Sequence, residues 1–277
     1  MKRREFVSAV GTIALAGSAG VFRRTKDRLD RIGLELYTVR DELARDFEGT
    51  LQRVAGLGYR EVEFTDYFGR SVNAVRAAVA TAGLTAPSAQ VPSSDLRTAY
   101  ASRIDRAKAI GHTYLVCGWV PPAERRSLSD WHSLIALFKT VGQAAHRAGL
   151  QFAYHNHDFE FARVEGHVPY DLLLEATDPS LVQLELDVYW ATKGGRNPVD
   201  LLARWPGRFP LLHLKDMASG PQHEFTELGR GIIDFRQILA QARTGGVRHL
   251  YVEQDEGRVP PFERARIGYD YLRALRF

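Results

Sequence analysis

Residues 149–157 read Gly-Leu-Gln-Phe-Ala-Tyr-His-Asn-His, and this order of residue types recurs along most of the chain. A glycine that can end a helix comes first, a short apolar run follows, and polar side chains come last. Such runs are expected to form eight strands, at residues 31–36, 61–64, 85–90, 113–117, 151–155, 182–187, 210–213 and 249–253. Because longer segments of helical periodicity separate them, the pattern predicts parallel βα units.

The helical segments are expected at residues 47–57, 72–82, 96–110, 131–148, 198–205 and 235–245, with a last helix that ends near residue 275. Four of them are followed by a glycine just before the next strand, namely Gly58, Gly83, Gly111 and Gly149. Eight such units predict one (β/α)8 barrel with its reactive groups at the carboxyl ends of the strands. An open, doubly wound sheet is the alternative, but residues 35–40 lack the glycine-rich fingerprint that binds a nucleotide cofactor.

The composition is that of a globular protein. It has 277 residues and a formal net charge of +4, from 37 basic and 33 acidic side chains, so we expect one domain and no nucleic-acid partner. The single cysteine, Cys117, excludes an internal disulfide and a cysteine-based metal cluster. It ends an apolar run, which predicts an inert buried thiol rather than a nucleophile.

The N-terminus resembles a targeting signal. Arg3 and Arg4 precede a weakly apolar stretch, which resembles a twin-arginine export signal, so residues 1–28 are expected to form this signal and a short linker. The barrel domain is then expected at residues 29–277, and the protein in the periplasm. The stretch is short for a stable membrane span. A retained anchor and an ordinary amphipathic helix are the alternatives.

Polar residues gather where the last four expected strands end. These strands finish at His155, Asp187, His213 and Glu253. A carboxylate in this position can instead cap the following helix, but four donors in succession predict a shared mouth. A mixed shell of imidazoles and carboxylates suits a divalent transition metal better than Ca2+. We expect Mn2+ first, with Zn2+, Co2+, Fe2+ or Mg2+ as alternatives.

Such a site suits carbonyl sugars, which are weak carbon acids. A divalent ion stabilises the enediolate that forms when a carboxylate removes the proton next to a carbonyl. Trp119 and Trp190 follow strands, so they are expected to stack on the apolar face of a sugar, although packing under a loop explains them equally well.

Six segments together resemble the sugar phosphate isomerase/epimerase family of the xylose isomerase-like barrel superfamily: residues 36–40, 58–63, 154–160, 186–190, 213–216 and 253–255. The resemblance runs from about Arg31 to the C-terminus. It implies that Asp187, His213 and Glu253 are metal ligands. His155 stands where ketose epimerases of this family carry a glutamate, and we expect it to be the fourth ligand.

The resemblance also implies roles for other residues. Glu253 is expected to be the base, with His155 or His157 as its proton-carrying partner. Substrate contacts are expected from Glu63, Gln90, Trp119, Glu160, Trp190 and Lys215. Three of these have alternatives: a helix cap for Glu63, a metal ligand for Glu160 and a surface pair with Asp216 for Lys215.

The function expected is that of a metal-dependent isomerase or epimerase. Its partner would be a small carbohydrate, a non-phosphorylated sugar or keto-sugar, because export disfavours phosphorylated substrates. A histidine replacing a glutamate also favours a related lyase reaction, as in inosose dehydratase or enzymes that process 3-keto-glycosides. Two further alternatives are a phosphodiesterase of the AP-endonuclease type, which would need more ligands and a basic groove, and a sugar-binding barrel without turnover.

Overall fold

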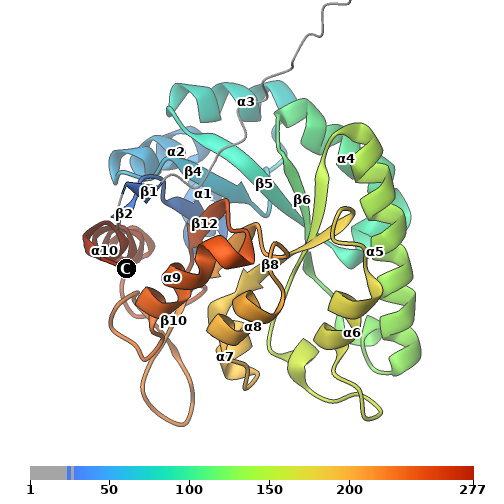
Figure 1. Ribbon diagram of the computed structural model, residues 1–277. Coiled ribbons are helices and arrows are strands. Elements are labelled where there is room, and N and C mark those ends of the chain that lie inside the picture. The colour runs from blue at the N-terminus through green and yellow to red at the C-terminus, as the bar shows by residue number, and fades with distance from the viewer. Residues whose placement is uncertain (1–23, 26–27) are drawn as a thin grey trace, which may run out of the picture.

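Eight parallel strands close into a barrel in the computed structural model, which describes residues 24–25 and 28–277 (Figure 1). Around the barrel the order is β12-β3-β4-β5-β6-β7-β8-β9, so strands adjacent in sequence are adjacent in space. Their bounds are β3 Gly33–Glu35, β4 Glu61–Phe64, β5 Thr85–Pro92, β6 Tyr114–Trp119, β7 Gln151–His155, β8 Val182–Asp187, β9 Leu211–Leu214 and β12 His249–Val252. The predicted single (β/α)8 barrel is confirmed.

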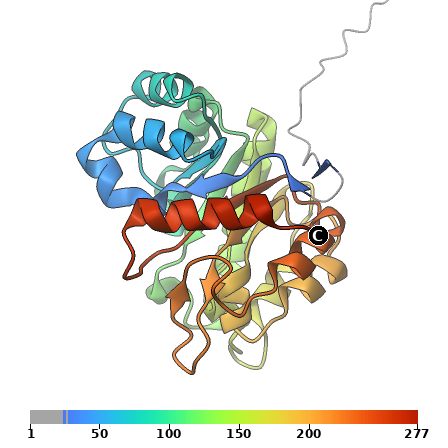
Figure 2. The same ribbon diagram turned by 90° about the vertical axis from the view of Figure 1, so that its left-hand side faces the viewer.

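Helices surround the barrel on its outside (Figures 1 and 2). Those expected from periodicity are α2 Phe47–Gly56, α3 Val72–Thr81, α4 Ser93–Ile110, α5 Leu128–Ala148, α8 Pro198–Arg204, α9 Phe235–Gly245 and α10 Pro261–Ala274. Three shorter helices were not predicted: α1 Arg40–Arg45, α6 Pro169–Ala176 and α7 Val188–Lys193. They are six to eight residues long, a length at which the periodic signal is weak, although α8, with seven residues, was predicted.

Two small hairpins add to the barrel. β1 Arg24–Thr25 pairs with β2 Arg28–Leu29, and β10 Asp216–Met217 pairs with β11 Phe225–Thr226. The second hairpin follows β9 and projects from the end of the barrel where the strands terminate (Figure 2). It therefore stands beside the mouth of the barrel.

The helix-ending glycines do what the sequence predicts. Gly149 follows α5 in a left-handed conformation with φ of 83°, and its N–H bonds back to the helix. Gly58 has φ of 112°, and a Cβ there would lie 2.3 Å from the ring of Tyr269. Only glycine fits this junction without strain.

The barrel interior is filled below the mouth. Tyr114, Val116, Ala153, Leu211 and Tyr251 form a buried apolar layer inside the strands. Side chains that point into the barrel above this layer are therefore shut off from the opposite end, as in a packed core rather than a pore.

Cys117 is buried in β6, and burial raises the pKa of its thiol. The predicted export signal, residues 1–28, lies almost wholly outside the described residues and stays a prediction. In the described part of the chain, every helix is too short or too polar to cross a membrane.

Candidate active site

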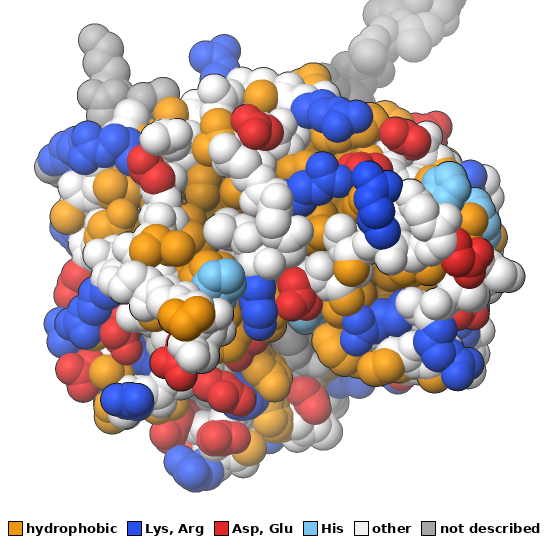
Figure 3. Space-filling view, turned by 90° about the horizontal axis from the view of Figure 1, so that it is seen from below, with side chains coloured by type: hydrophobic (Ala, Val, Ile, Leu, Met, Phe, Trp, Pro, Cys, Tyr) orange, Lys and Arg blue, Asp and Glu red, His pale blue; other side chains and the backbone are white. Residues whose placement is uncertain are grey.

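An inner cavity of about 620 Å³ opens at the carboxyl ends of the strands. Figure 3 views this face, where acidic, basic, histidine and hydrophobic side chains meet near the middle. The polar floor of the cavity includes His155, Lys215, Glu253 and Asp255, and its walls include Trp119 and Trp190. Both the place and the size are those of an active site in a barrel enzyme.

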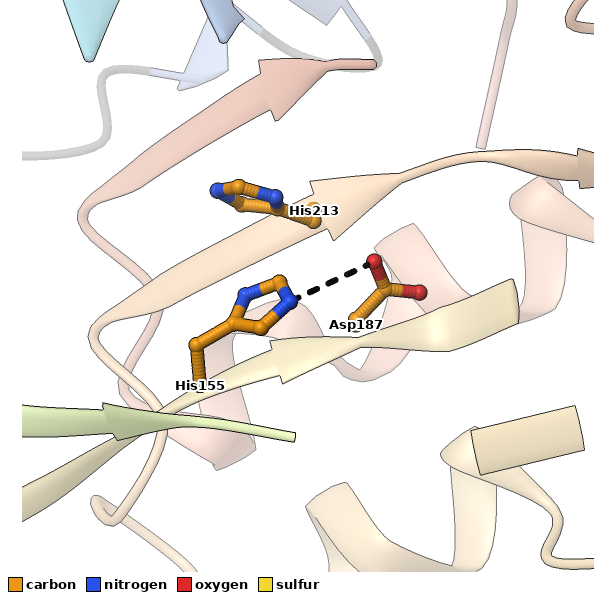
Figure 4. A group of neighbouring side chains, drawn as sticks. All are labelled: His155, Asp187 and His213. Carbon is orange, nitrogen blue, oxygen red and sulfur yellow. Dashed lines mark ion pairs between the residues drawn. The ribbon is translucent and has the colours of Figure 1, made fainter. Parts of the chain in front are cut away.

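Three of the four predicted metal ligands converge. His155 is the last residue of β7, Asp187 is the last of β8, and His213 lies in β9 (Figure 4). One donor atom from each lies within 4.8 Å of the others, and all three side chains are buried. His155 Nε2 is 3.9 Å from Asp187 Oδ2. Asp187 also accepts a hydrogen bond from the N–H of Trp190, so it caps α7 as well.

The fourth predicted ligand, Glu253, lies beside this group. Its Oε2 is 2.6 Å from His213 Nδ1 and 3.0 Å from the ammonium of Lys215. Lys215 also lies 3.2 Å from Asp187 and 2.9 Å from Asp255. Because Lys215 is almost fully buried, the alternative that it forms a surface pair with Asp216 is wrong.

The donor set fits a divalent metal. Asp187 Oδ2 is buried and accepts no hydrogen bond from the described residues, although the ammonium of Lys215 lies near it. Two imidazoles and a carboxylate are ligands that Zn2+, Mn2+, Co2+ and Fe2+ share. His155, Asp187 and His213 therefore form a group able to hold such an ion, with Glu253 as their neighbour. Glu35, Glu63 and His213 form a second buried group of this kind.

A second layer of side chains holds the two histidines from behind. His213 Nε2 lies 2.9 Å from Glu63, and His155 Nδ1 lies 3.1 Å from Glu185. Gln90 donates to both carboxylates, at 2.8 and 2.9 Å. A carboxylate bound to the outer nitrogen fixes the tautomer and orientation of a metal-binding histidine.

This layer also shows what the sequence reasoning missed. Glu63 is buried against His213 and Gln90 and does not line the inner cavity; its predicted substrate contact stays a prediction. Glu185 was not singled out. It lies two residues before Asp187 on the same strand, and the period of two places both on the inward face. That spacing could have identified it.

Charge is distributed unevenly among the buried acids. Burial and then repulsion from Glu63 raise the pKa of Glu185 to about 8. Burial opposes ionisation of Glu253, but attraction to Lys215 and His213 outweighs it and lowers the pKa of this carboxyl. Burial disfavours the charged form of His213 too, yet Glu185 and Glu253 raise its pKa well above the usual value. Glu253 is thus ionised at neutral pH, between the ammonium of Lys215 and the ring of His213.

His155, at the end of β7, and His157, in the loop that follows, have lowered pKa values. Burial, and then repulsion from His213, hold the pKa of His155 well below its usual value. Burial and Lys215 lower the pKa of His157 to about 3. Both rings are neutral at pH 7, and their centroids lie 5.0 Å apart. A neutral imidazole can bind a metal or accept a proton.

The cavity wall is aromatic. The ring of His157 stacks on Phe159 at 5.4 Å, and Trp119 meets His157 edge-on at 5.0 Å. Trp119 is 42% exposed, and the guanidinium of Arg125 lies 5.3 Å over its ring. Glu160, the predicted substrate contact or alternative ligand, is buried behind this wall, where it accepts hydrogen bonds from Tyr154 and the N–H of His157.

Comparison with known proteins places this geometry among relatives. A family model described as xylose isomerase-like TIM barrel matches residues 51–275. An inosose dehydratase of Geobacillus kaustophilus is 29% identical over 175 residues, which cover 55% of this chain and 55% of the relative. One from Lacticaseibacillus casei is 27% identical over 164 residues, covering 52% and 54%. The chain thus matches about half the length of these curated relatives.

Solved structures extend the similarity over the whole barrel. A sugar phosphate isomerase/epimerase from Parabacteroides distasonis is 27% identical with a TM-score of 0.77, over 97% of this chain and 98% of its own. A crystal structure of IolI protein with a bound zinc atom has a TM-score of 0.71 at 14% identity, covering 87% and 95%. At that identity the second similarity concerns the fold alone. The family predicted from the sequence motifs is confirmed.

Proposed function

This chain belongs to the xylose isomerase-like TIM barrel family, and we propose that it is a metal-dependent isomerase or epimerase of a non-phosphorylated sugar or keto-sugar. The reaction would begin with removal of the proton next to the carbonyl. One observation carries the proposal: the ionised carboxylate of Glu253 lines the inner cavity beside a buried His155, Asp187 and His213 donor group.

Glu253 is placed to act as the base. It lines the cavity floor and is ionised at neutral pH, as a proton acceptor must be. Its pairing with Lys215 makes Glu253 a weak base. Transfer of the substrate proton to Glu253 must therefore be promoted electrostatically. The ammonium of Lys215 also faces the cavity, where it can stabilise an oxyanion as the proton leaves.

A metal would complete this arrangement. A divalent ion held by His155, Asp187, His213 and Glu253 would supply positive charge to neighbouring substrate oxygens. We expect Mn2+ first. Glu63 and Glu185 support the assignment because they hold the outer nitrogens of the two histidines.

His155 or His157 would return the proton. Both line the cavity and are neutral, so each can carry a proton during turnover. His157 is the better placed for this role if His155 binds metal, because its ring lies in the aromatic wall rather than in the donor group.

The chemistry of the cavity supports an uncharged sugar. Among the described residues that line it, the basic side chains are Lys215 and Arg125. Lys215 is already held by three carboxylates, and Arg125 lies 3.3 Å over the ring of Phe159. With the carboxylates of Asp158, Glu253 and Asp255 in the same lining, these two basic side chains give no surplus of positive charge for a phosphate. The rings of Trp119 and Trp190 suit the apolar face of a sugar.

Dehydration is the second candidate. It is supported by the inosose dehydratase relatives and by the histidine at position 155. The same proton would be removed from the carbon next to the carbonyl. The electron pair of that C–H bond would form a C=C bond, while the hydroxyl on the next carbon takes up one proton, which balances the one removed, and leaves as water.

A product analysis tests the proposal. The purified protein with Mn2+ would be incubated with ketohexoses, with inositols and inososes, and with 3-keto-glycosides, and the products identified by NMR. An isomer or epimer supports the first candidate and an unsaturated or dehydrated product the second. Metal content and turnover that both survive in His155→Glu and His155→Ala would refute the assignment of that ligand.

We also propose export to the periplasm, on the evidence of Arg3, Arg4 and the apolar stretch that follows them. Cell fractionation tests it. The protein should appear in the periplasmic fraction, and replacing both arginines by lysine should retain it in the cytoplasm; periplasmic protein in the double variant would contradict a twin-arginine signal.

A further inference from the structure

A second, outer cavity of about 1050 Å³ lies beside the inner one. It is formed by the β10–β11 hairpin, residues 222–227, and by the loop between β12 and α10, residues 254–261. Both segments extend from the same end of the barrel (Figure 2). The outer cavity therefore opens on the side where the proposed reaction takes place.

The two cavities share a boundary residue. Asp255 lines both, and its carboxylate is paired with Lys215 on the floor of the inner cavity. On one side of the boundary Tyr37 lines the inner cavity, and Arg40 lines the outer one. The guanidinium of Arg40 stacks on the Tyr37 ring at 4.1 Å and donates to the backbone carbonyls of Tyr37 and Asp255.

The opposite side of the boundary is built in the same way. Trp190 lines the inner cavity and its neighbour Tyr189 lines the outer one, with ring centroids 4.9 Å apart. A ligand longer than one ring could thus pass over Asp255 between these two pairs. On this side the aromatic wall is formed by Trp190, with Tyr189 buried behind it.

The charges of the outer cavity are balanced. Four basic side chains line it, Arg40, Lys193, Arg258 and Arg264, and four carboxylates match them, among them Glu224 and Glu256. A cavity that binds an anion would carry a surplus of positive charge. Alternating donors and acceptors without such a surplus suit a neutral group that carries many hydroxyls.

An aromatic face completes the site. Phe225 lies stacked on Tyr189 with centroids 4.5 Å apart, and it meets Trp190 edge-on at 5.6 Å. Aromatic rings beside hydrogen-bonding groups recognise a sugar, because a sugar ring has both an apolar face and a polar edge.

We propose that the outer cavity binds the second unit of a glycoside whose reacting ring occupies the inner cavity. This substrate class rests on the proposed function of the inner cavity. The second unit is uncharged and polyhydroxylated, such as another sugar ring, and it is joined to the first across Asp255.

Binding measurements on matched sugars test the inference. Isothermal titration of the Mn2+-loaded protein would compare fructose with lactulose and turanose, which carry a galactose or a glucose on fructose, and glucose with maltose. At least one disaccharide should bind about tenfold more tightly than its monosaccharide, through a few added hydrogen bonds. Arg258→Ala and Phe225→Ala should remove that gain and leave monosaccharide binding unchanged. Arg243→Ala, on the exposed face of α9, is the matched control and should retain the gain.

Two results would overturn the inference: no disaccharide of the panel binds more tightly than its monosaccharide, or the gain persists in Arg258→Ala and Phe225→Ala. Failure of the proposed function has a different signature. In that case no sugar of any length is converted by the metal-loaded protein, whether or not disaccharides bind more tightly.

Discussion

Two histidine–glutamate pairs stand at opposite ends of the barrel, and both involve strand β12. At the lower end, which is the end where the strands begin, His249 Nδ1 lies 2.8 Å from Glu61. At the mouth, where the strands end, His213 Nδ1 lies 2.6 Å from Glu253. β4 carries Glu61 and also Glu63, while β12 begins with His249 and leads directly into Glu253. The residue types are the same, but the surroundings differ.

The lower pair, His249 and Glu61, lies away from both cavities. Glu61 is also bonded by Arg31, whose side chain reaches out to solvent, and none of these residues borders the inner or the outer cavity. At the mouth Glu253 borders the inner cavity, and one buried carboxylate oxygen each of Glu63, Glu185 and Asp187 accepts no hydrogen bond from the described residues. The difference indicates that a histidine beside a carboxylate is a candidate site only where it also has a cavity and carboxylate oxygens without hydrogen bonds nearby.

The largest contrast is expected in turnover. Glu253→Gln keeps the shape of the side chain but removes the base, so kcat on the active sugar should fall by about 10²–10⁴-fold. Steady-state kinetics checks this. Glu61→Gln, the same change at the lower end, is the control and should leave kcat unchanged; a similar loss in both variants would remove the distinction between the two ends.

Metal affinity should separate the metal ligands at the mouth from the carboxylates behind them. Asp187→Asn should weaken Mn2+ binding more than 100-fold, because it removes a donor from the buried group, whereas Glu185→Gln, behind His155, should cost about 10–100-fold. Titration calorimetry with metal analysis measures both. Unchanged affinity in Asp187→Asn would place the metal elsewhere.

The mouth should also make stability depend on pH. Burial raises the pKa of Glu160 from 4.5 to about 7, so between these values the folded state binds a proton that the unfolded state has lost. The free energy of unfolding should therefore fall by about 3 kcal/mol from this group as the pH rises from 4.5 to above 7.

Urea unfolding at pH 5 and pH 8 measures this slope. Other buried acids titrate in the same range, so Glu160→Gln is needed to isolate the contribution. The variant should lose less stability than the wild type over the interval; identical slopes would show that Glu160 ionises normally.

The smallest effect is expected at the lower end. Glu61→Gln leaves His249 and Arg31 without their charged partner, which should lower the free energy of unfolding by about 1–3 kcal/mol. Thermal or urea unfolding at pH 7 measures it. A variant as stable as the wild type would mean that the lower pair contributes nothing to the fold.

Much of the barrel could be predicted from local pattern. Buried parallel strands read as short apolar runs, and glycine at a helix end needs only a left-handed backbone, as at Gly149. The strand-end residues His155, Asp187 and His213 were found because the ends of parallel strands meet at one rim.

What the sequence did not predict depends on distant contacts. Glu185, which the sequence analysis did not single out, is brought by the fold against Glu63, Gln90 and His213 of three other strands. The outer cavity is built from two loops that have no periodicity, residues 222–227 and 254–261. Whether a polar side chain faces a cavity or another side chain is settled by packing across the barrel.

Solvent exchange tests the central claim most directly. The Mn2+-loaded protein would be incubated in D2O with the panel of ketohexoses, inososes and 3-keto-glycosides, and deuterium located by NMR. The account predicts deuterium on the carbon next to the carbonyl of at least one sugar, with Glu61→Gln matching the wild type and Glu253→Gln giving none. Failure of deuterium to enter any sugar, or undiminished entry in Glu253→Gln, would contradict it.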